Sequence, residues 1–74
     1  MFIVSQDRTG MVNVERLDFI EAEEKDIICY MGQLEIKLGS YETEETAKKV
    51  MTGIKEFIER RIDNGEITYT MPVE

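Results

Sequence analysis

The sequence predicts a small α+β domain, in which an antiparallel β-meander sheet carries one amphipathic helix on one face and ends in a short C-terminal strand. Three observations predict this class. Residues 43–65 combine the signals of a helix start, a helix face and a helix end. The segments before them alternate between apolar runs and short polar turns, as hairpin strands do. A chain of 74 residues has room for one domain, residues 1–74, with one small core.

The first two strands are predicted as an N-terminal hairpin. Residues 2–5 are mostly apolar, and the polar segment 6–10 ends in Gly10, which is free to adopt a positive φ. Residues 11–14 resume the apolar pattern. The spacing therefore predicts two strands joined by a loop of about five residues.

Three more strands are predicted before the helix. Residues 17–23 form an extended segment, and 24–26 turn the chain into the run 27–31, which is apolar on both faces. Such a run is typical of a central strand covered on both sides. A reversal at 31–33 leads to 34–38, where apolar and charged residues alternate as in a half-buried strand.

Residues 43–65 are predicted as the only helix. Thr43 is a suitable N-cap, and Glu44 and Glu45 follow it in the first turn, where the helix dipole favours negative charge. The basic pair 60–61 suits the last turn, and Asn64-Gly65 supplies a left-handed end.

The helix has one apolar face and a charged face. Its apolar residues recur at three- and four-residue spacing and form one stripe, made of Ala47, Val50, Met51, Ile54, Phe57, Ile58 and Ile62. Three acid-first pairs at i,i+4 are expected on the charged face: Glu44–Lys48, Glu45–Lys49 and Glu56–Arg60. Gly53 interrupts the helix at a cost of about 1 kcal/mol relative to alanine, so a close approach by another element is expected there.

A last strand is predicted at 66–71, with Ile67, Tyr69 and Met71 on one face and Pro72 ending it. Because an unpaired strand edge favours association, this strand is expected to pair with a neighbouring molecule's sheet. The sheet face opposite the helix would carry Phe19, one side of 27–31, and Phe2 or Val4. A homodimer or higher oligomer is therefore expected.

The composition restricts the partners. Nine basic and sixteen acidic residues give a net charge of −7, which argues against direct nucleic-acid binding and against an anionic membrane surface. It is compatible with simple solubility, a basic protein partner or mimicry of a nucleic-acid backbone. Without a basic leader or an apolar run of about 20 residues, and with Cys29 as the one cysteine, we expect a cytoplasmic protein.

The residue types favour binding over catalysis. The chain has no histidine, no nucleophile elbow, no P-loop and no dinucleotide fingerprint, so neither an enzyme nor a cofactor is expected. Cys29 is expected to pack as a small hydrophobe. The acidic residues Glu21, Glu23, Glu24 and Asp26 lack the spacing of a calcium loop, and a charged hairpin tip explains them better than a metal site.

A small-ligand site is predicted around the first hairpin. Arginine, amide and hydroxyl groups beside glycine suit a phosphate- or base-bearing molecule; an ordinary turn with one exposed arginine is the alternative. The candidate ligand-binding residues are Gln6, Arg8, Asn13, Arg16, Tyr30 and Tyr69.

Two blocks of sequence carry a resemblance. The first is Phe2-Ile3-Val4-Ser5-Gln6-Asp7 with Val12-Asn13, and the second is residues 38–47 (LGSYETEETA). The chain resembles small uncharacterised proteins of Gram-positive bacteria and their phages. The resemblance implies a β-meander plus helix in a mobile-element setting, hence a bacterial host cell, and it carries no activity or site residues.

This setting suggests a phage-type counter-defence protein. In one hypothesis a homo-oligomer sequesters a nucleotide immune signal. In the alternative, an acidic inhibitor docks on a basic nucleic-acid-binding groove of a host protein, as some anti-CRISPR proteins do. A structural adaptor is a third reading.

Overall fold

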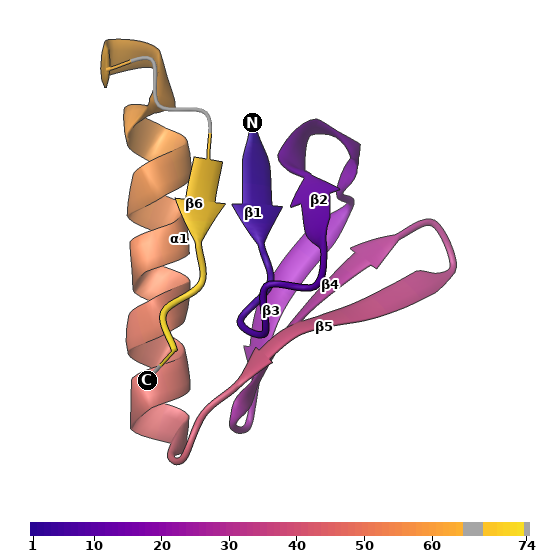
Figure 1. The fold of residues 1–74 in the computed structure, drawn as a ribbon, viewed down its shortest axis with the longest axis vertical. Helices are drawn as coiled ribbons and strands as arrows, with labels where there is room; N and C mark the ends of the chain where they lie inside the picture. Colours follow the sequence, from indigo (N-terminus) through magenta and orange to yellow (C-terminus); the bar gives the residue numbers. More distant parts are fainter. Residues whose placement is uncertain (65–67, 74) are drawn as a thin grey trace.

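A computed structural model describes residues 1–64 and 68–73, with the side chains of residues 61–64 outside that description. Figure 1 shows the long helix α1 beside short strands. The elements in chain order are β1 (Phe2–Val4), β2 (Met11–Asn13), the 3-10 turn η1 (Val14–Arg16), β3 (Phe19–Glu23), β4 (Asp26–Met31), β5 (Leu34–Ser40), α1 (Glu44–Asn64) and β6 (Thr68–Thr70). The predicted α+β class, the single helix and the short C-terminal strand are confirmed.

The strands divide between two three-stranded sheets instead of forming one. The first sheet has the order β2-β1-β6, and the second has the order β3-β4-β5. Within the first sheet β6 runs parallel to β1, with Ile3 opposite Tyr69. One edge of β6 therefore pairs within its own chain, and the expected pairing with a neighbouring molecule stays a prediction.

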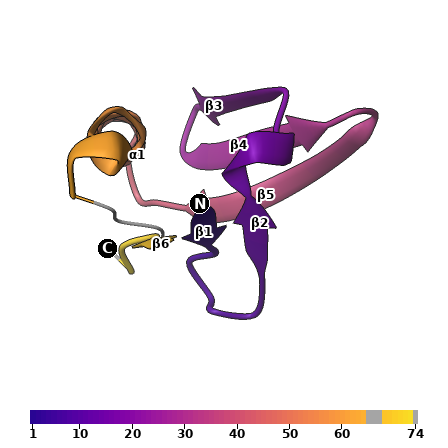
Figure 2. The same cartoon turned by 90° about the horizontal axis from the view of Figure 1, so that it is seen from above.

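The second sheet is a meander of two tight hairpins. Glu24 (φ 55°) and Gly32 (φ 62°) provide the left-handed residues of the two turns. A bulge at Leu38 shifts the β4–β5 register, because Ile27 lies opposite Gly39 while Ile28 lies opposite Lys37. Figures 1 and 2 both show the turn between β4 and β5 projecting away from the helix.

The helix begins as predicted and lies against both sheets. The Thr43 hydroxyl accepts a hydrogen bond from the Thr46 N–H at 3.1 Å, which confirms the N-cap. Seen from above in Figure 2, α1 lies beside the two sheets; it contacts β3 and β4, and Gly53 faces Tyr69 of β6.

The helix surface differs from the sequence-based picture at its aromatic residue and in its ion pairs. Phe57 lies only partly buried at the edge of the stripe and packs on Tyr69, with ring centroids 5.5 Å apart. Among the described side chains, the ion pair along the helix is Lys55–Glu59 at 3.3 Å, with the base first, and not one of the three acid-first pairs. The predictions for Arg61, Ile62, the Asn64-Gly65 end and Ile67 lie outside the described residues.

One hydrophobic core joins the helix to both sheets. Its central side chains, Ile3, Ile27, Cys29 and Ile54, have no solvent-exposed surface. Cys29 packs as a small hydrophobe, as predicted, and burial raises the pKa of its thiol. The remaining buried members of the core are Val12, Leu38, Tyr41, Ala47, Val50 and Met71.

Candidate functional site

The structure distributes the six predicted ligand-binding residues over several separate places. Gln6 and Arg8 lie in the turn between β1 and β2, Asn13 ends β2, Arg16 ends η1, Tyr30 lies on β4 and Tyr69 on β6. Of these, Gln6 and Arg8 come together, because Arg8 Nη1 donates to the Gln6 carbonyl at 3.0 Å.

Arg8 and Gln6 hold the end of the chain through main-chain carbonyls. Arg8 Nη1 also donates to the Met71 carbonyl at 2.8 Å, and Gln6 Nε2 donates to the Val73 carbonyl at 2.8 Å. The second amide atom of Gln6, Oε1, accepts from the Ser40 N–H at 2.8 Å. Both side chains therefore make the intramolecular bonds that fix the fold.

Tyr41 completes this arrangement. Its hydroxyl donates to the Pro72 carbonyl at 2.8 Å, so residues 71, 72 and 73 each accept a hydrogen bond from a different side chain. We call these three contacts the C-terminal clasp. Arg8 takes a left-handed φ of 64°, where the sequence suggested Gly10. Arg8 is therefore not simply an exposed turn arginine, because its side chain holds main-chain carbonyls.

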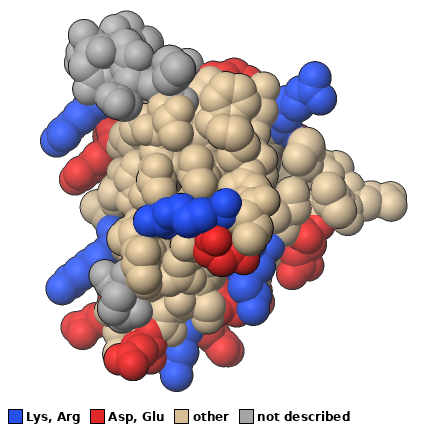
Figure 3. All heavy atoms as spheres, viewed as in Figure 1, with Lys and Arg blue, Asp and Glu red and all other residues tan. Residues whose placement is uncertain are grey.

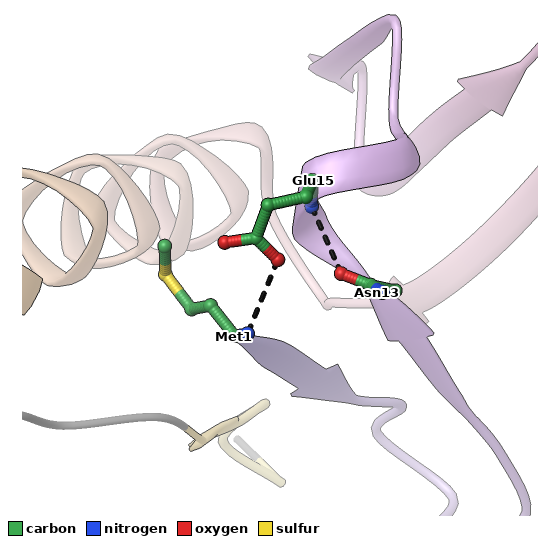
Figure 4. A network of polar contacts seen from close by, with 3 residues as sticks. All are labelled: Met1, Asn13 and Glu15. Atoms are coloured by element: carbon green, nitrogen blue, oxygen red, sulfur yellow. Dashed lines mark hydrogen bonds and ion pairs between the residues drawn. The ribbon is translucent and has the colours of Figure 1, made fainter.

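Asn13 also has a structural role. Its Oδ1 accepts from the Glu15 N–H at 3.0 Å and so caps η1, while a Glu15 carboxylate oxygen lies 3.1 Å from the Met1 amino group, as Figure 4 shows. Arg16 follows directly and is exposed, without a side-chain partner among the described residues.

Tyr69 faces the helix, and burial raises the pKa of its phenol. Its hydroxyl oxygen lies 3.0 Å from the position that a Cβ would take on Gly53, which confirms the predicted close approach. Tyr69 therefore packs from β6 against the helix.

The outer face of the second sheet gathers a different set of residues. Ile27 and Cys29 belong to the core, so alternation along β4 places Ile28 and Tyr30 on the opposite side. The strand register then adds their neighbours on β3 and β5. We call this surface the acidic face; it consists of Phe19, Glu21, Glu23, Asp26, Ile28, Tyr30, Glu35 and Lys37.

An aromatic pair lies on the acidic face. Phe19 is 57% exposed, and its ring centroid lies 6.0 Å from that of Tyr30. The Tyr30 hydroxyl donates to a Glu21 carboxylate oxygen at 2.8 Å. That hydrogen bond, with the negative charges of Glu21, Glu35 and Glu23, raises the pKa of Tyr30 to about 12.

The charge on this face is strongly unbalanced. Lys37 is its one cation, and its Nζ lies 3.8 Å from an Asp26 carboxylate oxygen. Glu21, Glu23 and Glu35 make no ion pair among the described residues. On the face seen in Figure 3, by contrast, basic and acidic side chains are interspersed around the margin. An exposed phenyl ring beside unbalanced carboxylates suits a cationic partner.

Neither a metal centre nor a membrane span emerges from the described part of the chain. No group of three or more cysteine, aspartate or glutamate side chains there is arranged to hold a metal ion. No helix in the described ranges combines the length and apolar character needed to cross a membrane.

The expectation for the sheet face away from the helix is confirmed for Phe19 and one side of 27–31, but it was wrong for Phe2 and Val4, which lie on β1 of the first sheet. That expectation did not link Phe19 with Glu21, Glu23 and Glu35, which share the same face. The signal was the alternation in residues 19–23, where the aromatic residue and both glutamates fall on one side.

Comparison of the chain with protein-family models, curated proteins and solved structures finds no match.

Proposed function

We propose that the chain is a non-enzymatic binding protein that docks its acidic face on a basic surface of another protein, in the manner of an inhibitor that covers a nucleic-acid-binding groove. The observation that carries the proposal is the position of Phe19, exposed and paired with Tyr30, on the same face as Glu21, Glu23 and Glu35, which make no ion pair among the described residues. In the mobile-element setting that the resemblance implies, such binding would serve counter-defence.

The two components of the face have separate roles in this proposal. The carboxylates accelerate encounter with a cationic groove and orient the complex, and added salt weakens this contribution. The aromatic pair supplies an apolar anchor, because buried aromatic side chains often dominate the energy of an interface. Nucleic acid would compete with the protein, since both need the same basic surface of the partner.

The geometry supports this hypothesis better than the nucleotide-sequestering one. Gln6 and Arg8 direct their donors at main-chain carbonyls, Asn13 caps η1, and Tyr69 packs against the helix. A nucleotide site built from them would first have to break these contacts. The nucleotide hypothesis stays a prediction, and calorimetry with a panel of nucleotides tests it.

The test uses purified nucleic-acid-binding proteins of a bacterial host, measured by calorimetry at low and high salt. A true partner binds the wild type, releases its nucleic acid, and loses affinity with salt. Phe19→Ala and Glu21→Gln/Glu23→Gln should each weaken that binding at least tenfold. The matched control is Glu42→Gln/Glu56→Gln, which removes the same charge from exposed positions off this face. Equal losses in the control and test variants would refute docking through the acidic face.

A further inference from the structure

The main-chain groups of β4 alternate in direction, and two hydrogen bonds show which residues face which neighbour. The Lys25 carbonyl, just before β4, accepts from the Tyr41 N–H at 2.8 Å. The Tyr30 carbonyl accepts from the Asp18 N–H, just before β3, at 2.9 Å. In an antiparallel ladder this direction alternates from residue to residue. The odd-numbered residues of β4 therefore bond to β5, and the even-numbered ones bond to β3.

This alternation leaves part of the outer edge of β5 without a partner. Ile36 and Leu34 lie opposite the odd-numbered residues of β4 and so direct their main-chain groups inward. Glu35, which lies between them, and Lys37, which follows Ile36, direct their N–H and C=O groups away from the sheet. An edge of this kind is a template for pairing with another strand.

The first sheet closes this edge further along. The Gln6 N–H donates to the Leu38 carbonyl at 2.8 Å, and the Gln6 side chain accepts from the Ser40 N–H. The open part of the edge therefore ends at Lys37. Beside it lies a hollow of about 230 Å³, whose apolar wall is formed by Met11, Val12, Ile36 and Leu38.

We propose that the open edge of β5 pairs antiparallel with the same edge of a second copy of this chain, about a two-fold axis at Ile36. The sequence Leu34-Glu35-Ile36-Lys37-Leu38 is self-complementary in this register. Glu35 lies opposite the partner's Lys37, and Ile36 lies opposite the partner's Ile36. The main-chain groups of Glu35 and Lys37 form the hydrogen-bonded pairs, as their outward direction requires.

The same register brings the exposed side chain of Leu34 against the second copy. Leu34 is 57% exposed and lies next to the projecting β4–β5 turn. It comes just past the partner's Lys37, where the open edge ends, at the hollow beside the β5 edge. Burial of this side chain in the hollow, twice in a symmetric dimer, adds an apolar contribution to the two cross-strand ion pairs.

The other strand edges are less suited to symmetric pairing. A β3 pair centred on Glu21 would place two like charges opposite each other, which is destabilising. The edge strands β2 and β6 each have three residues. Of the four edges, β5 combines length with complementary charge.

Charge reversal tests the register. Wild type should show a concentration-dependent dimer in analytical ultracentrifugation. Glu35→Lys and Lys37→Glu should each weaken it by about tenfold, because each places like charges opposite each other at two symmetric positions. The double variant should restore the wild-type affinity. The two single changes alter the net charge in opposite directions, so a general charge effect cannot produce this pattern. Lys49→Glu on the helix is the control and should dimerise as wild type does.

Leu34→Ser tests the hollow independently, and the exposed position of Leu34 means that the fold should survive this change. It should weaken the dimer at least tenfold, whereas Val73→Ser, which changes a side chain that is 64% exposed elsewhere, should have no effect. A wild type that stays monomeric at the highest attainable concentration overturns the proposal. Single charge variants that dimerise like wild type, or a double variant no better than the singles, also overturn it.

Discussion

The hydroxyl oxygen of Tyr69 lies 3.0 Å from the point where a Cβ would stand on Gly53. This contact explains a glycine in the middle of a 21-residue helix. Tyr69 belongs to β6 and packs its ring on Phe57 of the helix. The absence of a side chain at Gly53 therefore leaves room for Tyr69, so that β6 can pack against the helix.

Gly53→Ala should have opposite effects in two backgrounds. In wild type the new methyl group displaces the Tyr69 ring, and we expect a small net loss of stability. In Tyr69→Phe the obstructing oxygen is absent, so the alanine should stabilise the helix by about 1 kcal/mol. Urea unfolding of the four proteins measures the coupling, which should be on the order of 1 kcal/mol. Equal effects in both backgrounds would show that this oxygen does not restrict the helix.

The elements of the fold were predictable because their signals are local. The Thr43 cap, the helix stripe and the alternation in 34–38 each depend on neighbouring residues. The parallel pairing of β6 with β1 depends on residues far apart in the chain, and no local pattern encodes it. The two sheets separate between β2 and β3, where the chain passes through the 3-10 turn η1 and the two strands do not pair. From the sequence, these strands were expected to continue one meander.

The structure disperses the predicted ligand-binding residues for a related reason. Arginine and amide side chains beside a glycine can bind a ligand or can bond to the main chain, and their sequence is the same in both cases. The choice was made by residues 71–73, which return to the first turn and present three carbonyls to Arg8, Gln6 and Tyr41. The acidic face, in contrast, follows from period-two alternation and could have been read from the sequence.

The centre of the helix–sheet contact is Ile54 and not Phe57. Ile54 has no exposed surface, whereas Phe57 is partly exposed. Ile54→Ala should therefore cost about 2–5 kcal/mol, and Phe57→Ala should cost less, roughly 1–2 kcal/mol. Denaturant midpoints of the two variants give the comparison. A larger loss for Phe57→Ala would contradict the helix register described above.

Arg8 has a strained backbone, and its side chain holds the C-terminal segment. Its guanidinium holds the Met71 carbonyl, while its φ of 64° suits glycine better. Arg8→Ala should therefore destabilise the protein by about 1–2 kcal/mol, since it loses the bond and keeps the strain. Arg8→Gly should recover about 1 kcal/mol of that loss. Hydrogen exchange of the Met71 amide, which donates to the Val4 carbonyl, reports the clasp directly and should accelerate in both variants. If the exchange rate of the Met71 amide is unchanged, Arg8 does not hold the C-terminal segment.

The phenol of Tyr30 gives the acidic face a measurable pH response. Its pKa is raised from 10.0 to about 12, first by the hydrogen bond to Glu21 and then by burial and nearby carboxylates. The folded state therefore holds this proton more tightly than the unfolded chain does. The stability that it contributes is fully present below pH 10.0 and is lost as the pH rises toward about 12. Carbon NMR of the Tyr30 ring should show the high pKa, and Glu21→Gln should lower it, because the neutral amide removes the repulsion of the phenolate. The pKa of Tyr69, which burial raises, should not respond to Glu21→Gln. If Tyr30 titrates like a free tyrosine in wild type, its hydroxyl does not donate to Glu21, and the acidic face is not organised as described.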